Sequence, residues 1–346
     1  MLQNKYFLAC SLTIMVALIY FVIYLILNGF QGAASNKKII IDQDGGADDA
    51  MAIFMGLLNE EYFKGPEIVA ITTTHGNVDE EQAFNNTQRI LTVADRRDIP
   101  IYRGTSSSLI GNYPSDNFFG LDGLGDTFKE DFEPIAAQKD HAVFGLIEMS
   151  KKFEGELIIV ALGALTNIAL AKKIDPKFMS RLSHLYVAAG HIYGDDFQKP
   201  EFNALMDVEA YHIVLEKSDP EKTTVIPFSQ ILLYQNISKE WRQDILGSIN
   251  TKIMRNQNIY ETKSLNTSSN WSLLDPSAMA IALNEYLVVE ETRYSQNDII
   301  LCGEKRGVNT NNFTSVKDAN CKVVYKVRKH EYKQFLYDLF SAELYN

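Results

Sequence analysis

The sequence predicts an α/β protein in which helices cover both faces of a mostly parallel central sheet, preceded by one N-terminal transmembrane or signal helix. Two observations predict the sheet: short runs rich in β-branched residues recur along the chain, and amphipathic stretches of helical period follow most of them. A third predicts the N-terminal helix, because residues 6–27 are apolar almost without interruption. With 346 residues, of which 46% are hydrophobic, the chain can bury a substantial core.

Residues 1–35 are expected to form a signal anchor or a signal peptide, and residues 36–346 one further domain. A helix needs about 20 apolar residues to cross a hydrocarbon core, whereas a cleaved signal usually has an apolar region of about 7–15. The length of the apolar run therefore favours an uncleaved membrane anchor, although the small residues from Gly32 to Ser35 could form a cleavage site. Either alternative takes the domain into the secretory pathway, as a lumenal or extracellular domain or a secreted one.

Two other features agree with the secretory pathway. Asparagines in the Asn-X-Ser/Thr form that N-glycosylation requires are Asn85, Asn236, Asn266, Asn270 and Asn312. Cys302 and Cys321 could form one disulfide or remain free thiols, and their spacing does not decide between these alternatives.

The strands and helices are expected to alternate along the domain. The first strand is predicted at Lys38–Asp42, and a helix follows it from about Asp48 to Tyr62. Further strands are predicted at Glu67–Thr73, Glu156–Leu162, His184–Ala189, Thr223–Pro227 and Asp298–Cys302. Helical patterns follow most of them, for example Glu80–Val93 and Asp207–Leu215. Because ligands bind outside the carboxyl ends of the strands in an open parallel sheet, the segments after these strands are where a site is expected.

The charge of the chain excludes one class of partner. The formal net charge is -11 at pH 7. Nucleic-acid binding normally needs a clustered Lys and Arg surface that displaces counterions from the phosphates. We therefore expect no DNA or RNA partner.

Four carboxylates lie within eight residues directly after the first strand: Asp42, Asp44, Asp48 and Asp49. They would repel one another unless a cation lay among them, and Ca²⁺ accepts several carboxylate and carbonyl oxygens in a flexible geometry. The glycines between them allow a sharp bend of the backbone. Helix capping could explain Asp48 or Asp49, but it does not also explain Asp42 and Asp44.

Two chemistries use an Asp-X-Asp pair at the end of a strand. In phosphatases that resemble haloacid dehalogenases, the first Asp, here Asp42, becomes phosphorylated. In the other chemistry, carboxylates hold a metal ion that acidifies a water, and a neighbouring carboxylate accepts its proton. The phosphatase pattern usually has a Thr shortly after the second Asp, and residues 45–47 are Gly-Gly-Ala, so the metal-water chemistry is favoured.

The order of motifs over residues 38–283 resembles the inosine-uridine-preferring nucleoside hydrolase family. The family's opening D-x-D-P-G-x-D-D motif is similar to residues 42–49, with Gly45 in place of Pro. Other similar segments are Thr73–Asn77, Asp122–Gly125, Gly163–Asn167, Glu201–Asn203, Asp207–Ala210 and the pair Asp275-Pro276. The resemblance implies a nucleoside hydrolase-like fold and calcium-dependent hydrolysis of ribonucleosides to free base and ribose by a catalytic domain at residues 36–346. It also implies a homo-oligomer, either a dimer or a tetramer.

The resemblance implies a role for each matched residue. Asp44 would bind Ca²⁺ and accept a proton from the attacking water as the catalytic base. Asp49, Asp275 and the backbone carbonyl of Leu162 would complete the calcium ligation. The side chains that would hold the ribose hydroxyls are Asp48, Asn77, Glu201 and Asn203. Such anionic and amide groups favour a transition state in which the sugar gains oxocarbenium character.

Four positions depart from the family pattern. Leu274 replaces the His before the final D-P, which is associated with protonating the leaving base, and Phe119 replaces the His of an earlier turn. Asp195 replaces an Asn of the sugar-binding stretch, and Ala188 replaces a Met. Asp195 would still contact the sugar. These departures keep open an alternative function, a catalytically impaired, calcium-dependent nucleoside-binding ectodomain.

Aromatic residues could compensate for the missing histidines by stacking on the base. Phe119, Tyr234 and Trp271 lie in segments that could line a base site, and stacking contributes about 1–3 kcal/mol per base in nucleic-acid sites. This interpretation slightly favours purine ribonucleosides as substrates. Ordinary core packing is the alternative for each of these residues.

Overall fold

The computed structural model describes residues 36–111, 113–127, 132–194 and 197–345. The predicted N-terminal helix at residues 6–27 lies outside these ranges, and so does Asp195. Within them, no helix combines the length and the apolar character that a membrane crossing needs. The membrane anchor and the secretory location therefore stay predictions.

Within the described residues, nine strands form one sheet in the order β10-β9-β11-β6-β5-β4-β1-β2-β3. Their bounds are β1 (Lys38–Gln43), β2 (Glu67–Thr73), β3 (Ile101–Tyr102), β4 (Leu157–Ala161), β5 (His184–Ala188), β6 (Thr223–Ile226), β9 (Val289–Ile299), β10 (Asn309–Phe313) and β11 (Cys321–Val327). Neighbouring strands from β3 to β11 are parallel, and β9 and β10 continue the sheet in antiparallel fashion. The prediction of a mostly parallel sheet is confirmed.

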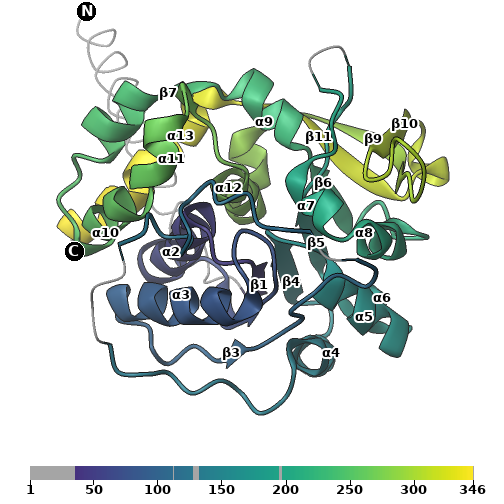
Figure 1. Cartoon of the computed structure of the whole chain (residues 1–346), viewed down its shortest axis with the longest axis horizontal. Coiled ribbons are helices and arrows are strands. Elements are labelled where there is room, and N and C mark those ends of the chain that lie inside the picture. Colours follow the sequence, from purple (N-terminus) through teal and green to yellow (C-terminus); the bar gives the residue numbers. More distant parts are fainter. Residues whose placement is uncertain (1–35, 112, 128–131, 195–196, 346) are drawn as a thin grey trace, which may run out of the picture. The chain divides into compact units, whose positions relative to one another are not determined.

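Helices flank this sheet, as Figure 1 shows. Those that carry the argument below are α2 (Ala47–Phe63), α3 (Glu80–Val93), α4 (Ala142–Lys152), α5 (Thr166–Ile174), α7 (Phe202–Met206), α8 (Val208–Leu215), α9 (Phe228–Tyr234), α10 (Lys252–Tyr260), α11 (Thr262–Thr267), α12 (Leu274–Val288) and α13 (Lys329–Ser341). The remaining ones are α6 (Phe178–Arg181), a π-helical turn at Trp241–Leu246, and 3₁₀ turns at Val316–Asp318 and Ala342–Leu344. A separate pair of antiparallel strands, β7 (Ile237–Ser238) and β8 (Asn270–Trp271), lies between α9 and α12 in the sequence.

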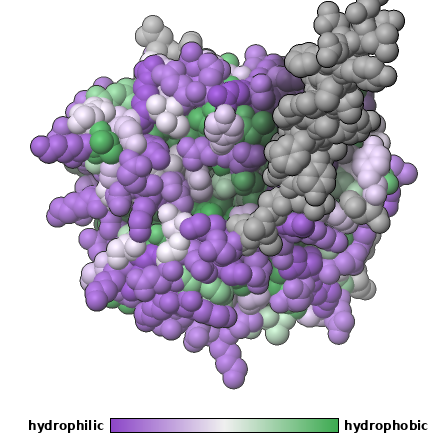
Figure 2. Space-filling view, turned by 180° about the vertical axis from the view of Figure 1, so that it is seen from behind, coloured by the Kyte–Doolittle hydropathy of each residue, from purple (hydrophilic) through white to green (hydrophobic). Residues whose placement is uncertain are grey.

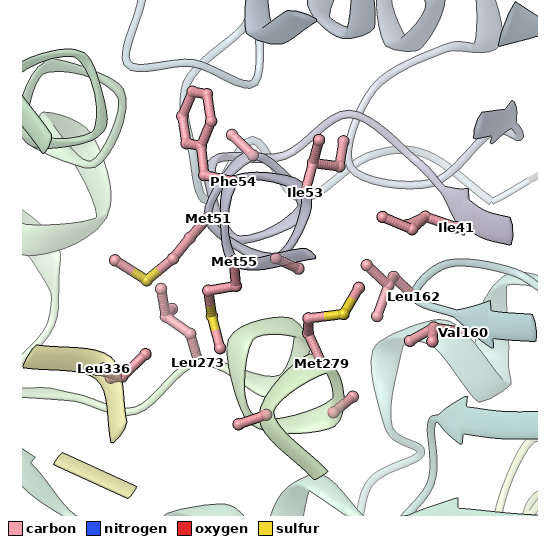
Figure 3. Close-up of a cluster of buried hydrophobic side chains, with 14 of the residues drawn as sticks. Ile41, Met51, Ile53, Phe54, Met55, Val160, Leu162, Leu273, Met279 and Leu336 are labelled. Atoms are coloured by element: carbon pink, nitrogen blue, oxygen red, sulfur yellow. The ribbon is translucent and has the colours of Figure 1, made fainter. Parts of the chain in front are cut away.

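The core has two layers because successive residues of a strand point to opposite faces of the sheet. In β1, Ile39 and Ile41 belong to one buried cluster, and Ile40 belongs to the other. The first cluster packs under α2, α12 and α13, and the second under α4, α5 and α8. Figure 3 shows Met55 of α2 and Met279 of α12 in the layer that these two helices share. Burying one such side chain contributes about 1.5–3 kcal/mol to folding.

The surface of the described residues is mostly hydrophilic on the face shown in Figure 2, with smaller hydrophobic areas between the polar side chains. This agrees with the share of charged residues, which is 22%. Singly scattered apolar side chains on a surface are ordinary and do not by themselves indicate a partner.

Two expectations about the C-terminal part need correction. The strand predicted at Asp298–Cys302 is instead the end of the longer antiparallel strand β9, and Cys302 lies beyond it. β9 alternates charged and polar residues with few β-branched ones, so the pattern used for the other strands did not detect it. Cys302 is exposed and Cys321 is buried, and both thiols are free, so the disulfide alternative is not supported.

Candidate active site

The acidic segment lies where the strand order reverses. β2 and β3 follow on one side of β1, whereas β4, β5 and β6 follow on the other. Asp42 at the end of β1 is paired with Thr72 of β2 and with Ala161 of β4, so both neighbouring strands end beside it. Such a reversal point opens a crevice at the carboxyl ends of the strands, and ligands of doubly wound sheets bind there.

A cavity of about 690 Å³ lies at this edge of the sheet. One group of lining residues is polar and includes acids, namely Asp48, Asn77, Asp116, Glu201, Asn203 and Asp275. A second group is apolar and mostly aromatic or branched, namely Phe118, Phe119, Leu162, Phe202, Phe228, Leu232, Leu273 and Leu274. A third group is polar and neutral, namely Asn236, Thr267, Ser268, Ser269, Asn270 and Ser272. The volume falls within the roughly 300–1,000 Å³ that small-molecule sites occupy.

Asp44 is buried and is not among the residues that line this cavity, and backbone groups hold its carboxylate in place. Its Oδ2 accepts a hydrogen bond from the backbone N–H of Asn77 at 3.0 Å, and its own N–H donates to Oδ1 of Asp49 at 3.2 Å. Gly76 packs so closely that a Cβ there would lie 1.8 Å from Asp44 Oδ2. The glycine of the Thr73–Asn77 turn is therefore needed for the carboxylate to fit.

Gly45 follows Asp44 in a backbone conformation that its counterpart in the family motif cannot adopt. Its φ is +87°, whereas the ring of a proline fixes φ near −65°. Asn86 donates a hydrogen bond to the Gly45 carbonyl at 2.7 Å and holds the turn against α3. A proline therefore could not adopt the turn that Gly45 forms after Asp44.

Asp48, Asp49 and Asp275 form a compact acid cluster. Each offers one carboxylate oxygen, and these oxygens all lie within 4.8 Å of one another. The first turn of α2 supplies Asp48 and Asp49, and the first turn of α12 supplies Asp275. The packing of α12 against α2 thus brings together residues that are more than 220 positions apart in the sequence.

The electrostatics of the cluster favour the binding of a cation. Burial, and then the neighbouring carboxylates, raise the pKa of Asp48, Asp49 and Asp275 well above the ordinary value. Burial also raises the pKa of Asp44 to about 7 and that of Asp42 to about 6. Asp48 Oδ1 is buried and has no hydrogen-bond partner among the described residues. Several buried carboxylates that lack counter-charge suit a divalent cation with oxygen ligands.

The Asn203 side chain connects Leu162, which directly follows β4, to the end of β5 beside the acid cluster. The Asn203 amide Nδ2 donates to the Leu162 carbonyl at 2.6 Å and to the Ala188 carbonyl at 2.9 Å. A carbonyl oxygen has two lone pairs, so the Leu162 oxygen retains one for another partner such as a metal ion. The structure therefore places Leu162 beside the predicted site, with Asn203 orienting its carbonyl.

Glu201 lines the cavity but also caps α7. Its two carboxylate oxygens accept hydrogen bonds from the backbone N–H groups of Gly190 at 2.8 Å and of Asn203 and Ala204 at 3.0 Å. Burial raises its pKa, and these hydrogen bonds to the charged form oppose that shift. The side chain is thus fixed at the wall of the cavity.

Phe119 and Trp271, two of the aromatic residues expected to contact the substrate, differ in their positions relative to the cavity. Phe119 lines the cavity and meets Phe118 edge to face, with ring centroids 4.8 Å apart. Trp271 is not among the lining residues: its indole N–H donates to Glu261 at 3.1 Å, and the Arg242 guanidinium lies 5.9 Å from its ring centre. The structure thus corrects the expectation for Trp271, whose indole is held inside a buried polar network.

Two other residues considered from the sequence have structural partners. Asp42 is fully buried, does not line the cavity, and accepts hydrogen bonds from Thr72 and Asn167, which argues against a phosphorylated nucleophile there. His191 accepts a hydrogen bond at Nδ1 from the backbone of Ser229, and burial lowers its pKa to about 4. It is therefore neutral at physiological pH.

Several lining residues were not singled out from the sequence. Phe118, Phe202, Phe228 and Ser272 each stand next to or near a residue that was, yet no local pattern separates a residue that lines a cavity from one that packs in the core. Phe202 had the best available signal, because it lies inside the Glu201–Asn203 motif.

Comparisons with known proteins identify relatives of this chain. A family model described as inosine-uridine preferring nucleoside hydrolase matches residues 39–334. The chain is 38% identical over 186 residues to a probable uridine nucleosidase 2 of Arabidopsis thaliana, a stretch that covers 51% of this chain and 55% of that protein. It is 33% identical over 186 residues to an inosine-uridine preferring nucleoside hydrolase of Leishmania major, covering 53% and 58%. The matched stretch thus spans about half the length of these relatives.

Solved structures match over a larger share of the chain. A plant nucleoside hydrolase covers 88% of this chain and 99% of its own, with a TM-score of 0.75 and 28% identity. A purine-preferring ribonucleoside hydrolase from Gardnerella vaginalis matches with the same coverage and TM-score at 26% identity. The nucleoside hydrolase-like fold expected from the sequence is confirmed.

Proposed function

The chain belongs to the inosine-uridine preferring nucleoside hydrolase family, and from that premise we propose that it hydrolyses the N-glycosidic bond of ribonucleosides to free base and ribose. The observation that carries the proposal is the acid cluster of Asp48, Asp49 and Asp275 at the strand reversal, opening on a cavity of nucleoside size. The cavity pairs acids and amides with apolar rings, which suits a ligand that has a hydroxylated sugar and a flat base.

We propose Ca²⁺ as the cofactor of this site. Asp48, Asp49 and Asp275 stand close enough to share an ion, and the Leu162 carbonyl lies at the same cavity. Asp44, whose N–H donates to Asp49, would join them as the resemblance implies. All of these are oxygen donors, which is the ligand set of hard cations such as Ca²⁺. When bound, the ion would lower the pKa of a water molecule so that hydroxide is available near neutral pH.

Asp44 is suited to accept the proton of the attacking water. Without a counter-charge its pKa is about 7, and a neighbouring cation would lower that value, so the carboxylate would be ionised at neutral pH. The Asn77 N–H fixes one of its oxygens and leaves the other for the proton. Asp44 thus acts as the general base of the proposed reaction.

The remaining acids and amides would hold the ribose. Asp48 Oδ1, which has no partner among the described residues, can accept a hydrogen bond from a sugar hydroxyl, and Asn77, Glu201 and Asn203 line the same cavity. As the bond to the base breaks, positive charge grows on the sugar, and fixed anionic groups stabilise that state more than the neutral ground state.

The preferred base is a separate question. Phe119, one of the aromatic residues expected from the sequence, lines the cavity together with Phe118, and both could contact a purine. The Arabidopsis relative is named for uridine, whereas the Gardnerella structure is named for purines. We propose ribonucleosides as the substrate class and retain purines as the slightly favoured members of it.

The proposal is tested by incubating the purified protein and Ca²⁺ with inosine, adenosine, guanosine and uridine and measuring free ribose. We expect ribose release from at least one of them, and the matched 2′-deoxynucleoside is expected to react about 10²-fold or more slowly, because polar groups built to bind the 2′-hydroxyl are left unpaired. Nucleoside binding without ribose release would instead support the alternative of a binding ectodomain, which Leu274 in the cavity favours.

Calcium is expected to stabilise the fold in a way that depends on pH. Carboxyls with raised pKa favour folding while protonated, and this contribution is lost as the pH rises through about 6 for Asp42 and about 7 for Asp44. At pH 8 the ion replaces the missing protons, so a saturating excess should raise the Tm by roughly 5–10 °C relative to excess EGTA. At pH 5 protons compete, and the shift should be much smaller. Thermal unfolding at both values measures this, and equal shifts at pH 5 and pH 8 would count against an acid-cluster site.

A further inference from the structure

Ser272 has a hydroxyl that the fold leaves without a partner. It lies between β8 and α12 and lines the cavity, and its Oγ is shielded from solvent with no hydrogen-bond partner among the described residues. Ser277, one turn into α12, shows the usual situation, because its Oγ donates to the Leu273 carbonyl and lies 2.8 Å from Gln235 Oε1. Buried hydroxyls are normally satisfied, so an unpaired one in a cavity wall indicates a partner supplied by the ligand.

The position of Ser272 indicates which part of the ligand it meets. Ser272 is three residues before Asp275 in the sequence. The Cα atoms of these two residues therefore lie within about 11 Å of each other, because that is roughly the longest distance that three residues of extended chain can span. The neutral polar residues beside it in the lining include Asn236 and Asn270, whose side-chain amides are joined by a hydrogen bond of 2.7 Å. Ser272 thus lines one cavity together with acids that suit sugar hydroxyls and neutral groups that suit a heterocyclic base.

We propose that the Ser272 hydroxyl donates a hydrogen bond to a ring nitrogen or carbonyl oxygen of the leaving base, and so acts as a specificity-determining residue. This inference rests on the proposed hydrolase function. Water gives one proton to Asp44 and adds its oxygen to C1′ of the ribose. The bond between C1′ and the base nitrogen breaks, and its electron pair goes to the base. The hydrogen bond stabilises the charge that develops on the base, which then takes a proton from solvent, and Ser272 is unchanged.

Leu274 makes such a contact more valuable in this chain. It replaces the histidine of the family motif and lines the cavity, so an apolar side chain stands where the motif has a proton donor. A serine hydroxyl cannot replace a general acid, but it can donate a hydrogen bond at any physiological pH. Charge stabilisation by a positioned donor then takes the place of protonation.

The test compares two leaving groups in wild type and Ser272→Ala. One substrate is the best natural ribonucleoside, and the other is 4-nitrophenyl riboside, whose leaving group is stable as an anion and carries none of the base's hydrogen-bonding atoms. We expect the ratio of kcat/KM for the nucleoside to kcat/KM for the aryl riboside to fall about tenfold, the loss of one hydrogen bond. Ser277→Ala is the matched control, and it should leave this ratio unchanged because Ser277 bonds to protein groups instead.

Two outcomes would overturn the proposal: an unchanged ratio in Ser272→Ala, or the same change of ratio in Ser277→Ala. If the wild type hydrolyses neither substrate, the proposed function fails, and the Ser272 contact is then decided by calorimetric binding of the same nucleoside. In that case affinity about tenfold weaker in Ser272→Ala than in wild type supports the contact, and equal affinity refutes it.

Discussion

Replacing Asp44 by Ala is expected to reduce kcat/KM for ribonucleosides about 10²–10⁴-fold, the usual contribution of a positioned general base. The loss should be accompanied by little loss of folding. Burial raises the pKa of Asp44, so the ionised carboxylate opposes folding when no cation is present. In excess EGTA at pH 8 the variant should therefore unfold at the wild-type temperature or above it, while the calcium-induced rise in Tm should largely disappear.

Steady-state ribose release and thermal unfolding measure these two effects on the same samples. Asp44→Asn keeps the shape of the side chain beside Gly76 and should lose activity as Asp44→Ala does, since it lacks the basic oxygen. Asp98→Asn is the control, because Asp98 forms an exposed ion pair with Arg96, and such pairs contribute little. Chelation of wild type with EGTA should abolish activity reversibly. Full activity of Asp44→Ala, or of metal-free wild type, would refute the proposed mechanism.

Replacing Arg242 by Met is expected to destabilise the protein by about 3–5 kcal/mol, because it leaves a charge buried without its partner. Arg242 Nε lies 2.9 Å from Glu261 Oε2, and both side chains are fully buried. Glu261 also accepts hydrogen bonds from Trp271 at 3.1 Å and from Gln257 at 2.8 Å. These neutral donors do not cancel its charge, so the Tm should fall by roughly 10 °C.

A double-mutant cycle separates the cost of the unpaired charge from the cost of lost packing. In Arg242→Met with Glu261→Gln, no buried charge remains, and most of the lost stability should return. Denaturant unfolding of the four proteins measures the coupling. If each single variant is nearly as stable as wild type and their losses of stability add in the double variant, the buried ion pair has no coupling energy. That outcome would contradict the prediction.

The sequence predicted elements best where local signals and tertiary packing agree. β2 has the predicted bounds because an apolar run of β-branched residues also fits a buried strand inside the sheet. α3 has the predicted bounds because Asp79 caps it by accepting a hydrogen bond from the Gln82 N–H. The antiparallel strands β9 and β10 were missed or misplaced because their polar side chains carry no such pattern, and their pairing is decided by contacts distant in sequence.

The site was predictable where chemistry is concentrated in short motifs. Asp49 and Asp275, two of the implied metal ligands, come together with Asp48, which the resemblance assigned to the ribose, since strand ends and helix starts converge at the reversal of the sheet. Trp271 shows the limit of such reasoning. Whether its ring faces the cavity depends on Glu261 and Arg242, whose side chains it meets only in the folded chain. The unpaired hydroxyl of Ser272 is equally invisible in the sequence, because it is defined by the partners that the fold does not supply.

The distance in sequence between the two halves of the acid cluster has a consequence for how the protein matures. Asp48 and Asp49 emerge early from the ribosome, but Asp275 follows only after β1 to β6 have been synthesised. Contacts of such high sequence separation form late, since a long loop must close before they are made. If the site holds calcium as proposed, a chain interrupted before α12 would bind the ion only weakly, and tight uptake would report that a newly made molecule has completed its fold.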